Sequence, residues 1–145
     1  MAELGPAHGA VLATVAAAAL IHNGWMGFKI GQARKKYNVP YPALYAPAGH
    51  KNEKEFNCIQ RGMQNSLENL PTFYALLLTA GYKYPLAAAS CGAVYLLGRI
   101  LYFNGYATGN PEKRYKGGFG HLGQIGLLGM VIRWSVELLA PAFKA

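Results

Sequence analysis

Two sets of polar side chains recur at helical spacing within otherwise apolar parts of the chain. The first set follows positions i, i+4, i+8 and i+11 and consists of Asn57, Arg61, Asn65 and Glu68. The second follows i, i+4, i+7 and i+11 and consists of Tyr95, Arg99, Tyr102 and Tyr106. Positions with this spacing share one face of an α-helix, so each set predicts a single polar stripe.

These residue types suit the binding of a small zwitterion. Arginine holds carboxylates with a planar fork of donors, glutamate can take an ammonium group, and asparagine and tyrosine hydrogen-bond the remainder. We expect a pocket that consists of Arg61, Asn65, Glu68, Tyr102 and Tyr106, with Arg114 close above it. The alternative is a polar network that fixes helix packing, in which Arg61 pairs with Glu68 and Arg99 contacts a neighbouring helix.

The elements that carry both stripes are predicted to be membrane spans. Of the 145 residues, 52% are hydrophobic and only 14% are charged, against roughly 25% charged in an average soluble domain. Four stretches are long and apolar enough for the roughly 20 helical residues that cross a bilayer, namely residues 7–28, 57–82, 84–106 and 118–143. The prediction is an all-α integral membrane protein, with residues 1–145 forming one domain, a bundle of four transmembrane helices.

The net charge is +8, and the uneven distribution of the positive residues between the two sides predicts an orientation in the membrane. The loop at 32–56 and the link at 107–117 supply Arg34, Lys35, Lys36, Lys51, Lys54, Lys113, Arg114 and Lys116, whereas the other side has Lys83 and Lys144. Positive residues favour the cytosolic side, so both segments are expected there and both termini opposite. The basic residues flank apolar stretches and do not line one polar face, which favours a membrane surface over nucleic acid.

Other signals in the sequence favour packing. Gly118, Gly120 and Gly123 form a G-x-G-x-x-G pattern, but neither a strand nor a following acidic residue accompanies it as in a dinucleotide site. Glycines at 117, 120, 123, 126 and 129 instead predict a close approach of the fourth span to its neighbours. Arg133 and Glu137, at i and i+4, predict an internal ion pair. The histidines lack metal-ligand spacing, and no metal site is expected.

Several of these segments resemble one family of membrane proteins. They are residues 56–61 (FNCIQR), 64–68 (QNSLE) with Pro71, 98–102 (GRILY), 105–109 (GYATG) and 33–37 (ARKKY). Together they resemble the membrane-associated proteins in eicosanoid and glutathione metabolism, and most closely the microsomal glutathione S-transferase 3 branch. The resemblance implies a homotrimer in the endoplasmic reticulum or a related endomembrane, with glutathione bound between protomers on the cytosolic side.

The resemblance also implies roles for single residues and an activity. Glutathione binding falls to Arg61, Asn65, Glu68, Tyr102 and Tyr106, with Arg34 supplied by the adjacent protomer. The thiol-activating arginine corresponds to Arg114, with Lys113 competing by one residue of register, and Tyr102 completes the catalytic set. The implied reactions are conjugation of lipophilic electrophiles and reduction of lipid hydroperoxides, with glutathione as co-substrate and without a further cofactor.

Two departures separate the chain from relatives with other functions. Met63 and Asn69 stand where the leukotriene-synthesising members have glutamine and tyrosine, which bears on leukotriene biosynthesis more than on glutathione binding. The competing interpretation is a non-catalytic fatty-acid-binding membrane protein that resembles the lipoxygenase-activating protein. Such a protein has no need of Arg114, so the complete basic and tyrosine set favours the enzyme.

Overall fold

The computed structural model describes residues 4–143, which form five α-helices and contain no β-strand. The first rod runs from His8 to Tyr37: α1 (His8–Ala19) continues through a π-helical stretch (Leu20–Met26) into α2 (Gly27–Tyr37). Next come α3 (Glu53–Lys83) and α4 (Pro85–Ala107), joined by a tight turn. A 3-10 helix, η2 (Pro111–Gly117), precedes α5 (Gly120–Leu139), and Ala140–Phe143 forms a last 3-10 turn.

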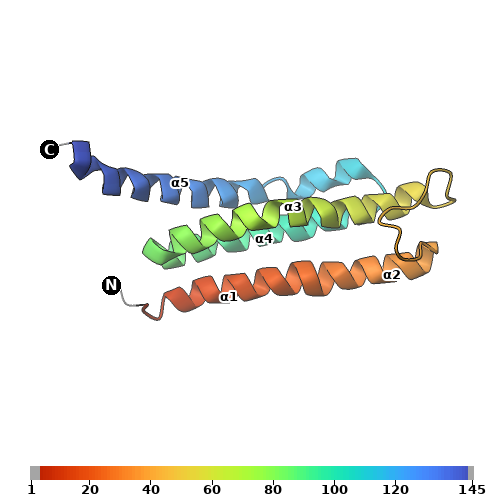
Figure 1. Ribbon diagram of the computed structural model, residues 1–145, viewed down its shortest axis with the longest axis horizontal. Helices are drawn as coiled ribbons and strands as arrows, with labels where there is room; N and C mark the ends of the chain where they lie inside the picture. The colour runs from red at the N-terminus through yellow and green to blue at the C-terminus, as the bar shows by residue number, and fades with distance from the viewer. Residues whose placement is uncertain (1–3, 144–145) are drawn as a thin grey trace.

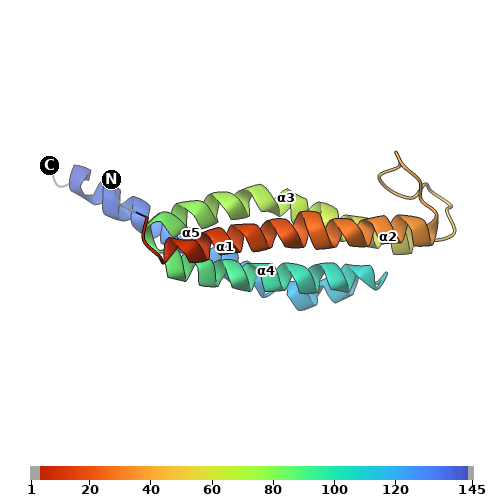
Figure 2. The ribbon, with the colours of Figure 1, turned by 90° about the horizontal axis from the view of Figure 1, so that it is seen from below.

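The rods lie side by side as an elongated bundle (Figures 1 and 2). The two ends of the chain lie at one end of the bundle, whereas the loop between α2 and α3 lies at the other (Figure 1). This arrangement agrees with the prediction that both termini share a side and that the basic loop lies opposite. Lys144, which entered the charge count, lies outside the described residues.

Within residues 4–143, three helical segments are long and apolar enough to cross a membrane: His8–Tyr37, Pro85–Ala107 and Gly120–Phe143. The predicted spans 84–106 and 118–143 agree with the bounds of two of these segments to within two residues at each end, and their crossing of a membrane stays a prediction. The predicted second span, 57–82, lies within α3, whose 31 residues give sufficient length. The polar stripe lowers the mean hydropathy of α3, so this helix is long enough but not apolar enough to count as a membrane span by composition. The count of four spans therefore stays a prediction.

The predicted boundary of the first loop is wrong. Arg34, Lys35 and Lys36 belong to the last turn of α2 and not to the loop, which begins at Asn38. Lysine and arginine are good helix formers, and their charge suits the negative end of the helix dipole. The helix ends because Asn38 adopts a left-handed conformation, with φ of 55°, and because two prolines follow shortly after it.

Glycines set the close contact between α4 and the segment that follows it. A Cβ atom at Gly120 would lie 2.9 Å from the Cα of Gly98, and one at Gly123 would overlap the carbonyl oxygen of Cys91. Gly117 meets the backbone of α4 as closely, and a Cβ atom at Gly126 would lie 2.7 Å from the Cys91 sulfur, so the predicted role is confirmed for four of the five glycines. The prediction is wrong for Gly129, which faces open space.

A hydrophobic cluster at one end and a set of ion pairs at the other hold the bundle together. At the basic end, Met26, Val39, Phe56 and Phe103 are almost fully buried and pack the loop against α3 and α4. At the opposite end, Arg133 Nε donates to Glu137 Oε1 at 3.0 Å, which confirms the predicted ion pair. Lys83 pairs with the same carboxylate, so the turn between α3 and α4 is tied to α5.

Candidate functional site

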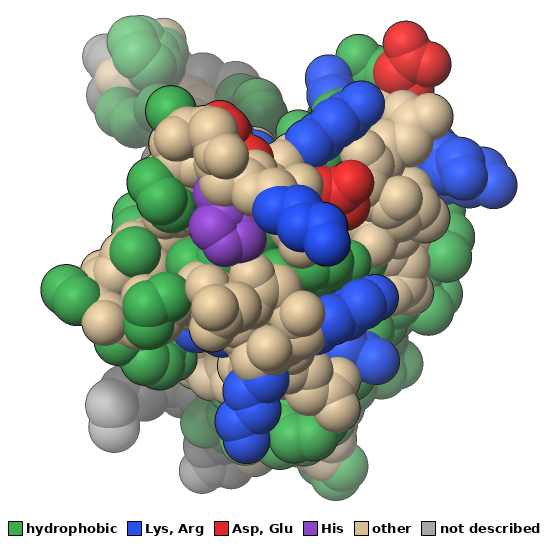
Figure 3. Space-filling view, turned by 90° about the vertical axis from the view of Figure 1, so that its right-hand side faces the viewer, with side chains coloured by type: hydrophobic (Ala, Val, Ile, Leu, Met, Phe, Trp, Pro, Cys, Tyr) green, Lys and Arg blue, Asp and Glu red, His purple; other side chains and the backbone are tan. Residues whose placement is uncertain are grey.

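Lys and Arg side chains outnumber acidic ones on the end of the bundle that carries the long loop (Figure 3). A cleft of about 520 Å³ opens at this end, where the start of α3, the end of α4 and the start of η2 meet. Its lining residues are Glu53, Lys54, Asn57, Cys58, Arg61, Tyr106 and Pro111. The structure therefore brings Arg61 and Tyr106 together, as predicted from the two stripes.

Arg61 and Glu68 form an ion pair along α3. Arg61 Nη1 donates to Glu68 Oε1 at 2.6 Å, and the two side chains are 44% and 45% exposed. An ion pair this open contributes only about 0–1 kcal/mol to stability, because water already solvates both charges. A zwitterionic ligand can therefore take over both partners at little cost, placing its carboxylate on Arg61 and its ammonium group on Glu68.

Asn65 is tied to a buried arginine. Arg99 is only 3% exposed, and its Nη2 donates to Asn65 Oδ1 at 2.9 Å and to Ser66 Oγ at 2.8 Å. Arg99 thus contacts a neighbouring helix, as the packing interpretation predicts, while its guanidinium also lies 4.2 Å from the centre of the Tyr102 ring. Because a guanidinium only donates, it occupies Oδ1 of Asn65, and Nδ2 is the atom of this side chain that can donate.

Tyr102 and Arg114 are neighbours of Tyr106, which lines the cleft, whereas the predicted site residues Asn65, Glu68, Tyr102 and Arg114 are not among its lining residues. The two tyrosine rings meet edge to face with centres 5.3 Å apart, and the Arg114 guanidinium lies 5.6 Å from the centre of the Tyr106 ring. Arg114 Nη1 donates to the carbonyl oxygen of Pro111 at 3.1 Å, and Nη2 donates to the Tyr115 hydroxyl at 2.9 Å. Lys113 is exposed, so the geometry favours Arg114 for contact with a ligand in the cleft.

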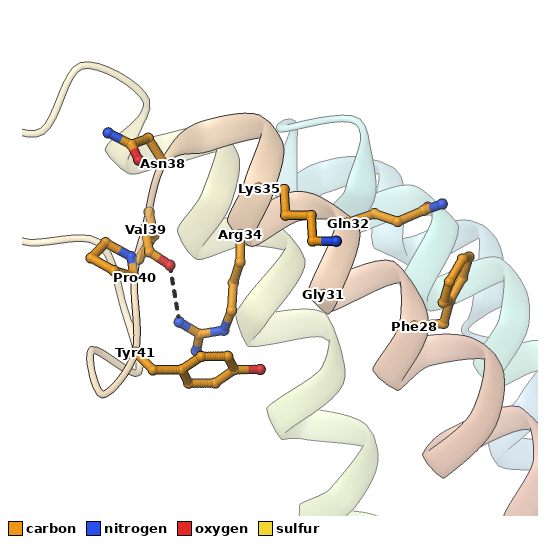
Figure 4. A pocket seen from close by; sticks show the side chains of 9 residues that line it. All are labelled: Phe28, Gly31, Gln32, Arg34, Lys35, Asn38, Val39, Pro40 and Tyr41. Atoms are coloured by element: carbon orange, nitrogen blue, oxygen red, sulfur yellow. Dashed lines mark hydrogen bonds between the residues drawn. The ribbon is translucent and has the colours of Figure 1, made fainter.

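Arg34 lies apart from this group, in a cavity of about 590 Å³ between α2 and the loop (Figure 4). Its buried guanidinium donates to the carbonyl oxygens of Val39 at 3.3 Å and Ala43 at 2.7 Å, and Tyr41 lies across it. No residue lines both this cavity and the cleft. Within one chain, therefore, the structure does not bring Arg34 to Arg61.

The structure adds lining residues that the sequence prediction missed. Glu53 and Lys54 line the cleft but precede the predicted start of the second span at residue 57, so the predicted stripe does not include them. The signal that indicates Lys54 is its spacing of seven residues, or about two helical turns, from Arg61. Asn57 reaches the cleft, yet its amide group holds the loop, since Oδ1 accepts from the backbone N–H of Ala46 at 2.8 Å. Cys58 is buried, and its thiol donates to the carbonyl oxygen of Gly109.

Comparisons with known proteins place the chain among related sequences. A sequence model of the MAPEG family matches residues 12–134, a range that includes every residue of the cleft. Human microsomal glutathione S-transferase 2 is 34% identical over 119 residues, which cover 81% of this chain and 76% of the relative. Bovine leukotriene C4 synthase is 35% identical over 105 residues, 72% of this chain and 66% of the relative. An uncharacterised Synechocystis protein is 40% identical over 115 residues, 79% and 74% of the two chains.

Proposed function

The chain belongs to the MAPEG family, and we propose that it is a membrane-bound glutathione transferase with glutathione-dependent peroxidase activity. The observation that carries the proposal is the placement of Arg114 beside Tyr106, which lines the same cleft as Arg61. These are residues for which the family resemblance implies contact with glutathione. The relatives named above include one glutathione transferase and one leukotriene C4 synthase. Membership of the type 3 branch stays a prediction.

The proposed chemistry begins with the glutathione thiol. The Arg61 and Glu68 pair would bind the zwitterionic end of glutathione, and Asn65 and the tyrosines would orient its backbone. A guanidinium beside the sulfur favours the thiolate, which is the actual nucleophile. The thiolate then forms a carbon–sulfur bond with a lipophilic electrophile, either as it opens an epoxide whose oxygen takes up a proton or as it displaces a leaving group that departs with the bonding electron pair.

With a lipid hydroperoxide, the thiolate attacks the peroxide oxygen and releases the alcohol. A second glutathione then completes the disulfide and releases water, so two glutathiones are oxidised as the hydroperoxide is reduced.

The experiment is glutathione binding to the detergent-purified protein, followed by product analysis with a fatty-acid hydroperoxide and with an electrophilic lipid. We expect saturable binding, a glutathione conjugate, and conversion of the hydroperoxide to the alcohol. Binding of fatty acid without either product would favour the non-catalytic interpretation instead. A conjugate without the alcohol would restrict the function to transfer.

We propose a homotrimer, because Arg34 lies outside the cleft of its own chain and the family resemblance implies that the adjacent protomer supplies it. Arg34→Ala and Arg61→Ala should each raise the KM for glutathione when expressed alone, and their co-expression should restore part of the activity at low glutathione, since some interfaces in mixed trimers combine both intact residues. Cross-linking in mild detergent should reach a trimer. A ladder that ends at dimer, or mixed protomers without recovered activity, would contradict shared sites.

We also propose that the cleft faces the cytosol, in the endoplasmic reticulum or a related endomembrane. The basic residues of the long loop and of η2 support this orientation through the positive-inside rule. Cysteine at Lys36 or Lys116 should therefore react with a membrane-impermeant reagent from the cytosolic side only. Labelling from the luminal side of sealed vesicles would reverse the assignment.

A further inference from the structure

We infer that Gly105 is a positioning residue for Arg114: its missing side chain lets η2 lie against α4 and so fixes where the guanidinium stands. This inference rests on the proposed role of Arg114 in activating glutathione. A Cβ atom at Gly105 would overlap the carbonyl group of Lys113 and lie 2.7 Å from the backbone nitrogen of Arg114. The obstructing atoms are backbone, so no side-chain rotation can relieve the overlap.

The segment that carries Arg114 has little freedom to move elsewhere. Only three residues separate the end of α4 at Ala107 from the start of η2 at Pro111. The turn there is fixed, since Gly109 adopts a φ of 76° and Asn110 Oδ1 accepts from the backbone N–H of Glu112 at 3.0 Å. A methyl group at Gly105 must therefore displace the Lys113–Arg114 backbone itself.

The far end of η2 is held in the same way. Gly117 packs against the carbonyl oxygen of Gly98, and a Cβ atom there would lie 2.5 Å from the backbone nitrogen of Tyr102. With both ends fixed on α4, the middle of η2 must bow outward if Gly105 gains a side chain. The guanidinium, which stands 5.6 Å from the centre of the Tyr106 ring, moves away from the cleft with it.

The displacement should affect chemistry more than glutathione affinity. Arg61, Asn65 and Glu68 lie on α3, whereas Gly105 meets η2. A misplacement of about 1 Å in a catalytic group can cost on the order of 100-fold in rate. Gly105→Ala should thus lower kcat with little change in KM, and it should raise the pH at which bound glutathione becomes a thiolate.

The test compares Gly105→Ala with Gly123→Ala in the full-length protein in detergent. Gly123 is the matched control: a Cβ atom there overlaps the carbonyl oxygen of Cys91 and lies 2.8 Å from the backbone nitrogen of Tyr95, in the same interface but away from Arg114. We expect both variants to lose thermal stability. Only Gly105→Ala should lower kcat, by about 10- to 100-fold, and shift the pH profile of thiolate absorbance upward.

An unchanged pH profile in Gly105→Ala, or the same shift in Gly123→Ala, would overturn the positioning role. If Gly105→Ala does not fold, Gly118→Ala perturbs the other end of η2 more mildly, since its Cβ atom would lie 3.1 Å from the carbonyl oxygen of Tyr115, the residue after Arg114. It should give a smaller shift in the same direction, and a wild-type profile would again overturn the inference.

Wild-type and Arg114→Ala proteins serve as references. A wild type without glutathione turnover would mean that the proposed function is wrong, whereas a wild-type-like Gly105→Ala beside an impaired Arg114→Ala removes the inference alone.

Discussion

Arg114→Ala should lower kcat by about 100-fold or more and leave the KM for glutathione within a few-fold of its wild-type value. Removal of one donor that stabilises a developing anion costs about 10²- to 10³-fold in other enzymes, because the interaction is made mainly in the transition state. Arg114 has neutral hydrogen-bond partners, Pro111 and Tyr115. Its positive charge therefore remains available to a ligand sulfur.

The sign of the pH effect follows from the charge. A guanidinium near the sulfur stabilises the thiolate, so the thiol of bound glutathione ionises at a lower pH than in solution. Without Arg114 that benefit is lost, and the rising limb of kcat should move to higher pH. Stopped-flow measurement of thiolate absorbance in glutathione-loaded protein, over a range of pH, gives this shift directly.

Lys113→Ala is the control for register. Lys113 is exposed, and its backbone, not its side chain, meets Gly105, so its loss should change kcat by less than about threefold. If Lys113→Ala abolishes thiolate formation while Arg114→Ala preserves it, the assignment is wrong by one residue. If neither variant has an effect, thiol activation by this segment fails altogether.

Part of this geometry is predictable from the sequence. The stripes at 57–68 and 95–106 have helical period. The bounds of α4 agree with the predicted segment 84–106 to within one residue at each end, since Pro85 stands in the first turn of the helix. The identity of the contacting pairs was not predictable. Whether Arg99 reaches Asn65 and Ser66, or a different turn of α3, depends on how the two helices cross, which periodicity does not encode.

The surroundings of Arg34 are harder still to predict. Its guanidinium binds carbonyl oxygens at Val39 and Ala43, and backbone acceptors leave no residue-type signature in a sequence. The same holds for Gly105, whose neighbours are backbone atoms of η2. The prolines at 40 and 42 show that the helix must end before them. They do not show at which earlier residue it ends.

Arg61→Ala and Glu68→Ala should each raise the KM for glutathione by about 10- to 100-fold and change kcat much less. Hydrogen bonds to charged groups contribute about 1.5–3 kcal/mol, and these two residues would hold glutathione in the ground state as well as in the transition state. Steady-state kinetics and direct glutathione binding measure the loss. In each variant the remaining partner also lacks its counter-ion in the free protein. The loss of binding free energy in the double variant should therefore be no larger than the sum of the losses in the two single variants.

The packing interpretation makes the opposite prediction for the same variants. If the Arg61–Glu68 pair served only to hold helices together, its removal would lower thermal stability and spare the KM. Both residues lie on α3 and are almost half exposed, so the pair joins no two helices and should contribute at most about 1 kcal/mol to folding. The control is Arg133→Ala, which breaks an arginine–glutamate pair at the opposite end of the bundle. Its KM for glutathione should match the wild type, and a rise equal to that of Arg61→Ala would show that the effect is not one of ligand contact.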